Sequence, residues 1–219
     1  MPTTEDQSTE ALLQMGWYLD TSLFQDFVNR NIRTAFDTAE EYDGHTLLRI
    51  TGLNKVGMRS FMPALGGGKR YQFELTKTIN YLQLTQYLFG TTFFYSELTK
   101  AEVIRALRAA HSGREKAEIL SWWDAFRYII SNYQKVDIDF HLDEELSDLA
   151  LHFPIRKNAQ DYIHLITARK KGLAFVTADK LADQIAELRL NFYQHIYYWP
   201  TFKEKIPIPD EFKQLLDKM

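Results

Sequence analysis

Short apolar runs alternate along the chain with longer segments in which apolar residues recur at helical spacing. Such runs occur at 17–19, at 91–95 and at 173–176, and a fourth segment, 135–140, alternates apolar and polar residues like a strand. Strands that alternate with helices form βαβ units, in which neighbouring strands are parallel. The pattern therefore predicts an α/β fold built on a central, mainly parallel sheet.

Helical spacing and helix stop signals follow each of these runs. Gly90 and Gly172 stand where two of the patterns stop, as glycine does after helices. Ser96, Thr99 and Asn158 are suited to cap helices at their starts. The helices are expected within 23–28, 76–90, 96–110, 116–133, 143–153, 158–172 and 180–190.

Composition shifts divide the chain into a main domain and three peripheral pieces. Residues 1–15 form a polar lead-in, and 200–219 form a proline-punctuated loop with a short helix. The main domain is expected at 16–199. Within it, 38–75 breaks the alternation with two strand-like runs around Gly66, Gly67 and Gly68, which predicts a hairpin-bearing insertion.

The overall composition is that of a soluble globular protein. Of the 219 residues, 45% are hydrophobic and 25% charged, and there is no apolar run of 18 residues, so no membrane partner is expected. The acid-bearing start "MPTTEDQSTE" argues against a secretory signal. The chain has no cysteine, which excludes disulfides and thiol catalysis. We expect a cytoplasmic location.

Charge is unevenly distributed, although the net charge of −3 alone disfavours a strongly nucleic-acid-binding surface. The stretch 44–73 carries no acid but five basic residues, together with three aromatic ones, whereas 136–148 holds six acids and no basic residue. Cations combined with aromatic rings suit single-stranded nucleic acid. Packing of those rings within their own hairpin is the alternative interpretation. The basic residues are Arg49, Lys55, Arg59, Lys69 and Arg70.

Four acids stand at strand ends or helix starts. Asp20 follows the first strand and Asp179 a buried one, while Glu102 and Asp161 lie in the first turns of two helices. Ligands bind beyond the carboxyl ends of the strands in open parallel sheets. Four carboxylates at one edge would raise one another's pKa unless a cation neutralised them, and oxygen ligands favour Mg²⁺ or Mn²⁺. Such a site can hydrolyse a phosphodiester bond.

Each acid alone also has an ordinary interpretation. A single aspartate after a strand usually belongs to a turn or caps a helix, and an acid in a first turn compensates the helix dipole. Glu97 is an alternative to Glu102, and we expect it to lie outside a metal site. Asp183 follows Asp179 by one helical turn and is either an outer ligand or part of a solvated face. His164, one turn after Asp161, is expected to be a packed helix residue rather than a catalytic base.

The stretches "YLDTSLF", "YSELTKAEVIRAL" and "DYIHLITARKKGLAFVTADK" resemble the successive motifs of PIN-domain nucleases, which include toxins of the virulence-associated protein C type. The resemblance covers 16–37 and 76–199. It implies a three-layer α/β/α fold and Mg²⁺- or Mn²⁺-dependent cleavage of single-stranded RNA. It further implies that Asp20, Glu102, Asp161 and Asp179 bind metal, with Thr177 and Ser22 in support. Ser22 is equally suited to cap a helix.

One departure concerns the spacing of the motifs. Glu102 follows Asp20 at a separation of 82 residues, about twice that of toxin-type members, and the surplus is largely the basic 38–75 segment. The resemblance therefore leaves open a toxin or an RNA-processing or decay enzyme, and a non-catalytic PIN-like RNA- or protein-binding module is the main alternative. A different two-metal enzyme on a similar sheet, such as a flap-type DNA nuclease or a phosphatase, is a further one.

The partners expected are an RNA substrate, an antitoxin-like protein and a second copy of the chain. The paired Trp122 and Trp123, on an amphipathic helix, suggest the homodimer contact. Phosphate contacts need cations. The RNA-binding candidates are Arg105, Lys180, Arg59, Lys69 and Arg70.

Overall fold

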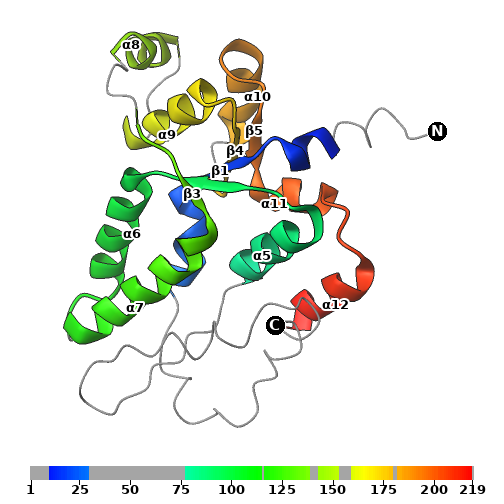
Figure 1. Cartoon of the computed structure of the whole chain (residues 1–219). Coiled ribbons are helices and arrows are strands. Elements are labelled where there is room, and N and C mark those ends of the chain that lie inside the picture. Colours follow the sequence, from blue (N-terminus) through cyan, green and yellow to red (C-terminus); the bar gives the residue numbers. More distant parts are fainter. Residues whose placement is uncertain are drawn as a thin grey trace. The chain divides into compact units, whose positions relative to one another are not determined.

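The computed structural model describes residues 10–29, 77–114, 116–138, 143–152, 159–179 and 182–218 (Figure 1). The expected insertion at 38–75 lies outside these residues, and with it Arg59, Lys69 and Arg70. Lys180 lies outside them as well. Asp183 belongs to a described helix, but its side chain is not among those described.

The strands of the described residues form one five-stranded, all-parallel sheet in the order β3-β2-β1-β4-β5. With its many helices, this sheet confirms the predicted α/β fold class. The central strand β1 pairs with β2 on one side and β4 on the other. The strands are β1 (Trp17–Leu19), β2 (Phe93–Tyr95), β3 (Gln134–Lys135), β4 (Ala174–Thr177) and β5 (Ile196–Tyr198).

The two edge strands differ from the sequence-based expectation. Strand β3 ends at Lys135, although an alternating pattern was expected to continue to residue 140. Beyond the strand, Val136 N–H still donates to Tyr95 O at 2.8 Å, and residues 139 and 140 lie outside the described residues. Strand β5 was not predicted, because the three residues Ile196–Tyr198 are too few to show a period. Within the described sheet, each of these two strands pairs with a neighbour on one side only. Short edge strands of this kind show little apolar pattern in the sequence.

Helices connect the strands and begin and end close to the expected signals. Gly90 and Gly172 have φ of 68° and 65° directly after or just beyond helices, a conformation that glycine adopts without strain. The α-helices are α2 (Gln25–Asn29), α5 (Lys77–Phe89), α6 (Glu97–Ala110), α7 (Lys116–Ile129), α8 (Asp143–His152), α9 (Ala159–Lys170), α10 (Ala182–Asn191), α11 (Trp199–Phe202) and α12 (Asp210–Lys218). Short 3₁₀ turns lie at Thr21–Phe24, Ile130–Asn132 and Lys203–Lys205.

The described residues fall into two compact units. The sheet unit comprises residues up to Leu23, Phe89–Glu102 and those within Tyr133–Pro207, and the helical unit comprises the remainder. An aromatic cluster forms the core of the helical unit: Phe24 packs on Phe126 and Phe27 on Trp122, with ring centroids 5.2 and 5.0 Å apart.

In the sheet unit, side chains on both faces of the central strands are buried, as a three-layer fold requires. On one face Tyr18 and Phe175 pack with apolar residues of α9 and α10, the helices that cover this face in Figure 1. On the other, Trp17 contacts Phe93 and Phe202, with ring centroids 5.5 and 5.0 Å apart. Among the described helices, none is long and apolar enough to cross a membrane.

Candidate active site

Two of the predicted acids follow neighbouring central strands at the carboxyl edge of the sheet. Asp20 comes directly after β1, and its backbone N–H donates to Val176 O of β4 at 3.0 Å. From β1 the strand order runs outward in both directions, to β2 and β3 on one side and to β4 and β5 on the other. In doubly wound sheets this reversal of strand order is the place where ligands bind. Asp20 and Asp179 therefore lie at the edge position best suited to a site.

Asp20 is held tightly by hydroxyl groups. Its side chain is buried, with 6% exposure, and its Oδ2 accepts hydrogen bonds from Ser22 Oγ at 2.5 Å and Thr177 Oγ1 at 2.7 Å. The two hydroxyls are themselves fixed by backbone donors, because Ala178 N–H donates to Ser22 and Asp179 N–H donates to Thr177. Two donors on one oxygen fix the rotamer of the carboxylate.

Glu102 reaches the same edge from the second turn of α6 rather than from its first turn as expected, because the helix begins at Glu97. The Oε2 of Glu102 accepts hydrogen bonds from Thr21 Oγ1 at 2.5 Å and from His164 Nε2 at 2.8 Å. Only 11% of the Glu102 side chain is exposed, and His164 is fully buried. Thr21 follows Asp20 directly, so the turn after β1 contacts both acids: Ser22 bonds Asp20 and Thr21 bonds Glu102.

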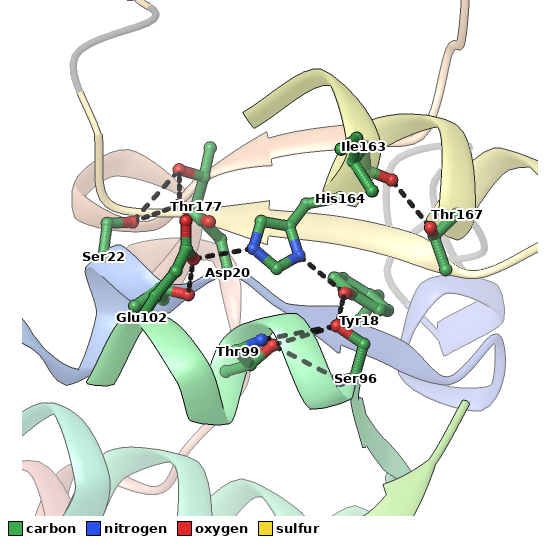
Figure 2. A network of polar contacts seen from close by, with 11 residues as sticks. Tyr18, Asp20, Ser22, Ser96, Thr99, Glu102, Ile163, His164, Thr167 and Thr177 are labelled. Carbon is green, nitrogen blue, oxygen red and sulfur yellow. Dashed lines mark hydrogen bonds and ion pairs between the residues drawn. The ribbon is translucent and has the colours of Figure 1, made fainter. Parts of the chain in front are cut away.

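A buried chain of hydrogen bonds continues behind Glu102 (Figure 2). His164 Nδ1 lies 2.6 Å from the hydroxyl oxygen of Tyr18, which lies 2.7 Å from Ser96 Oγ. Each imidazole nitrogen therefore has one partner, and this fixes the ring plane that faces Glu102. Burial raises the pKa of Tyr18 well above its ordinary value, and the charges of Asp20 and Glu102 add to the rise. The phenol is accordingly a neutral hydrogen-bonding group.

Ser96 also begins the helix that carries Glu102. Its Oγ accepts from Thr99 N–H at 3.4 Å, and Thr99 Oγ1 accepts from Ser96 N–H at 3.3 Å. This reciprocal pair is a capping box in which threonine takes the place of glutamate. The cap sets where α6 begins, so it also sets the height of Glu102 along the helix.

Asp161 and Asp179 are half-buried rather than enclosed. Burial, followed by the negative charges of Asp20, Asp179 and Glu102, raises the pKa of Asp161 to about 6, and His164 opposes the rise. The four acids from β1, α6, α9 and the end of β4 therefore act on one another electrostatically at one edge. Among the described residues, however, no three side chains of aspartate, glutamate or histidine lie close enough together to hold one metal ion.

Of the other predicted residues, the structure describes the side chains of Arg105 and Glu97. Arg105 is exposed one turn after Glu102 on α6. Glu97 bonds Lys100 at 3.0 Å and Lys135 at 3.2 Å, and the hydrogen bond from Lys100 leads the causes that lower its pKa. Glu97 therefore pairs with two lysines.

Sequence reasoning missed the roles of His164, Tyr18 and Thr21. His164 is packed as expected, but it also bonds a predicted metal ligand, which the spacing from Asp161 does not reveal. Tyr18 offered a signal: a tyrosine within a buried strand needs a partner for its hydroxyl. The signal says that a partner exists, and only the fold identifies His164 and Ser96.

Comparison with known proteins returned no match: no family model fits the chain, and no curated protein or solved structure is significantly similar to it. The resemblance to PIN-domain nucleases thus rests on the motifs quoted above.

Proposed function

We propose that the chain is a Mg²⁺- or Mn²⁺-dependent endoribonuclease of the PIN type, acting either as a toxin or in RNA processing or decay. The observation that carries the proposal is the placement of four acids toward the edge where the strand order of the sheet reverses, with the pKa of Asp161 raised by burial and by the charges of the other three. Acids that repel one another in a half-buried place are typical of a site that takes up a cation.

The donor set fits a hard divalent cation, because it consists of carboxylate oxygens without sulfur. Asp20 and Glu102 are already fixed by hydrogen bonds to one oxygen each, Oδ2 and Oε2. Asp161 and Asp179 are less enclosed, so their side chains can rotate toward a cation. We therefore assign the ligand set to these four acids. A bound cation would supply water activation and charge stabilisation for phosphodiester hydrolysis.

The remaining polar residues would position the ligands. Ser22 and Thr177 hold Asp20, and Thr21 and His164 hold Glu102. Fixing a carboxylate in advance removes the cost of ordering it when substrate and cation arrive. Backbone phosphates need cations nearby, and Arg105 is the described candidate.

The alternative function is a non-catalytic module that binds RNA or protein. In such a module the charge repulsion at Asp161 would serve no function, and the folded protein would be more stable with an apolar or amide side chain there. An antitoxin-like partner and a homodimer stay predictions. Trp122, one of the two tryptophans that suggested the dimer, is buried in the helical unit, and Trp123 packs on Phe126 at 5.7 Å between ring centroids.

Activity and metal binding test the proposal together. Wild type should cleave a structured RNA in Mn²⁺, and cleavage should stop with a chelator. The Asp179→Asn variant should lose about a hundredfold or more. Lys213→Gln, at a partly exposed position of α12, serves as the purification control. Equal cleavage by wild type and Asp179→Asn would identify a contaminant and overturn the enzyme assignment.

Melting temperature gives a readout that does not depend on turnover. Mn²⁺ should raise the melting temperature of wild type, because a ligand that binds only the folded state stabilises it. The rise should shrink in Asp161→Asn and Asp179→Asn. An equal rise in all three proteins would place the ion elsewhere and remove the four acids from the ligand set.

A further inference from the structure

Two neighbouring hollows lie beside the edge strand β5. The first, of about 410 Å³, runs along β5 toward α11, and the second, of about 550 Å³, lies between the end of α10 and the start of β4. Both are lined by Met15, Arg189 and His195, so they adjoin. Met15 precedes β1 and His195 precedes β5, while Tyr198 ends β5. The joint hollow, here called the edge groove, therefore starts at the amino ends of these strands and runs along β5.

The lining of the edge groove combines cations with aromatic rings. Arg189 and Lys205 are its cationic side chains, and among the described residues no aspartate or glutamate lines either hollow. This contrasts with a chain in which acids outnumber Lys and Arg, 29 to 26. Volumes of this size match those of ordinary ligand sites. The aromatic lining residues are Phe192, Tyr193, Tyr197, Tyr198 and Phe202.

Arg189 is fixed before any ligand arrives. Its Nε–H donates to Ile196 O at 2.5 Å, and its guanidinium carbon lies 5.2 Å from the centroid of the Tyr197 ring. Within the described part of the chain, neither Arg189 nor Lys205 has an acidic partner in salt-bridge contact. A fixed guanidinium and a nearby ammonium, both without acids beside them in the groove, favour an anion.

The remaining polar groups of the edge groove can form hydrogen bonds to a flat ring that carries polar atoms at its edge. His195 Nδ1 lies 3.4 Å from the Tyr197 hydroxyl oxygen, and its Nε2 lies 3.0 Å from the Gln194 amide nitrogen. Burial lowers the pKa of His195, so the ring is neutral near pH 7 and can both donate and accept. Leu12 and Met15 add an apolar surface on which a flat ring can rest.

We propose that the edge groove binds single-stranded RNA, with phosphates at Arg189 and Lys205 and bases against the aromatic and apolar lining. Cationic grooves with aromatic faces bind single strands in this way. The choice of RNA over another aromatic anion rests on the proposed function. The groove starts at the amino ends of β1 and β5, and a strand of four residues at 3.3 Å per residue separates that end from the acids by roughly 13 Å. A strand a few nucleotides long could occupy both.

Fluorescence anisotropy tests this with binding separated from cleavage. The probe is a fluorescein-labelled single-stranded RNA 12-mer, titrated with the full chain carrying Asp20→Asn, so that the RNA is not consumed. Adding Lys205→Glu should weaken binding by about three- to tenfold and make the salt dependence shallower. Lys213→Glu, the same charge change at a position outside the groove, should have no such effect.

A second variant guards against misfolding. Arg189→Gln removes the charge but keeps an amide that can bond Ile196 O, and it should weaken binding by a similar factor. Lys205 is exposed, so its substitution does not disturb the core. Unchanged RNA affinity in both variants would overturn the proposal. So would a rise in melting temperature with adenosine monophosphate or inorganic phosphate, lost in Lys205→Glu, if the 12-mer did not bind.

The two proposals fail in different ways. Groove-dependent RNA binding without cleavage by wild type would contradict the endoribonuclease and support the groove. Cleavage by wild type, together with an RNA affinity that neither groove variant changes, would support the endoribonuclease and contradict the groove.

Discussion

The four acids at the carboxyl edge form two pairs that the fold treats differently. Asp20 and Glu102, the held pair, are almost fully buried, and each accepts two side-chain hydrogen bonds on one oxygen. Asp161 and Asp179, the outer pair, are half-buried, and the pKa of Asp161 is raised to about 6. Hydrogen bonds build the held pair into the folded structure, whereas in the outer pair burial and the charges of neighbouring acids act against the ionised form of Asp161.

This difference separates stability from chemistry at one site. Removing Asp20 or Glu102 should reduce both stability and activity, because the hydroxyl donors lose their acceptor. Removing an outer acid should cost activity while making the folded state more stable, since repulsion is relieved. Sites that trade stability for function in this way are common in enzymes.

The largest effect is expected from Asp20→Asn. The amide has one acceptor oxygen for two donors and no charge, so activity with RNA in saturating Mn²⁺ should fall about 10²- to 10³-fold. The free energy of unfolding should also fall, by about 1–2 kcal/mol. Urea unfolding and cleavage rates check this. Asp137→Asn, at an exposed position, is the matched control and should change neither.

His164→Gln should have the next largest effect. Glutamine can still donate to Glu102 but cannot also reach Tyr18, so the carboxylate is held less firmly, and kcat should fall about tenfold with KM little changed. His111→Gln is a matched control, because His111 is buried too and bonds a backbone carbonyl, Val28 O, at 2.9 Å. Equal losses of kcat in both variants would mean that His164 is merely structural.

Tyr18→Phe removes only one hydroxyl from the buried chain. Ser96 and His164 each lose a partner, so the free energy of unfolding should fall by about 1–3 kcal/mol, with activity reduced only a few fold. Thermal and urea unfolding measure the change. An unchanged stability would show that the chain behind Glu102 contributes nothing to the held pair.

The smallest effect concerns the outer pair and depends on pH. Folding raises the pKa of Asp161 from its ordinary 3.8 to about 6, so its contribution to stability is full below pH 4 and is lost as pH rises through 6. In the metal-free protein, Asp161→Asn should therefore raise the free energy of unfolding at pH 7.5. The gain is about 1 kcal/mol, after discounting roughly 3 for solvent screening.

Below pH 4 this gain should vanish, which unfolding curves at pH 3.8 and 7.5 would detect. A gain that does not depend on pH would mean that Asp161 is not strained by its neighbours. The distinction between the held and outer pairs would then fail.

The sequence sufficed for the elements with strong local signals. Trp17–Leu19 and Ala174–Thr177 are apolar runs that end at polar residues, so both strands and the acids after them were readable. Strand β5 was not, because three residues with two tyrosines carry no period and the strand exists only by pairing with β4. The order of the strands in the sheet could not be predicted from the sequence either, because strand pairing joins residues far apart along the chain.

The site divides in the same way. The four acids were predicted from their places at element ends, but their two environments were not. Those depend on Thr21, His164 and Thr177 meeting the acids across long distances in sequence, up to 157 residues. Hydrogen bonds between residues so far apart leave no local pattern.

The position of β1 at the centre of the sheet has a consequence for how the molecule is made. Trp17 pairs with Phe93 and with Ala174, so the first strand to be synthesised is completed on its second side by one of the last. At about 5–20 residues per second, the ribosome needs roughly 8–30 s to reach the second partner. Until then Asp20 lacks its bond to Val176, and the carboxyl edge is assembled only after β4 has been synthesised.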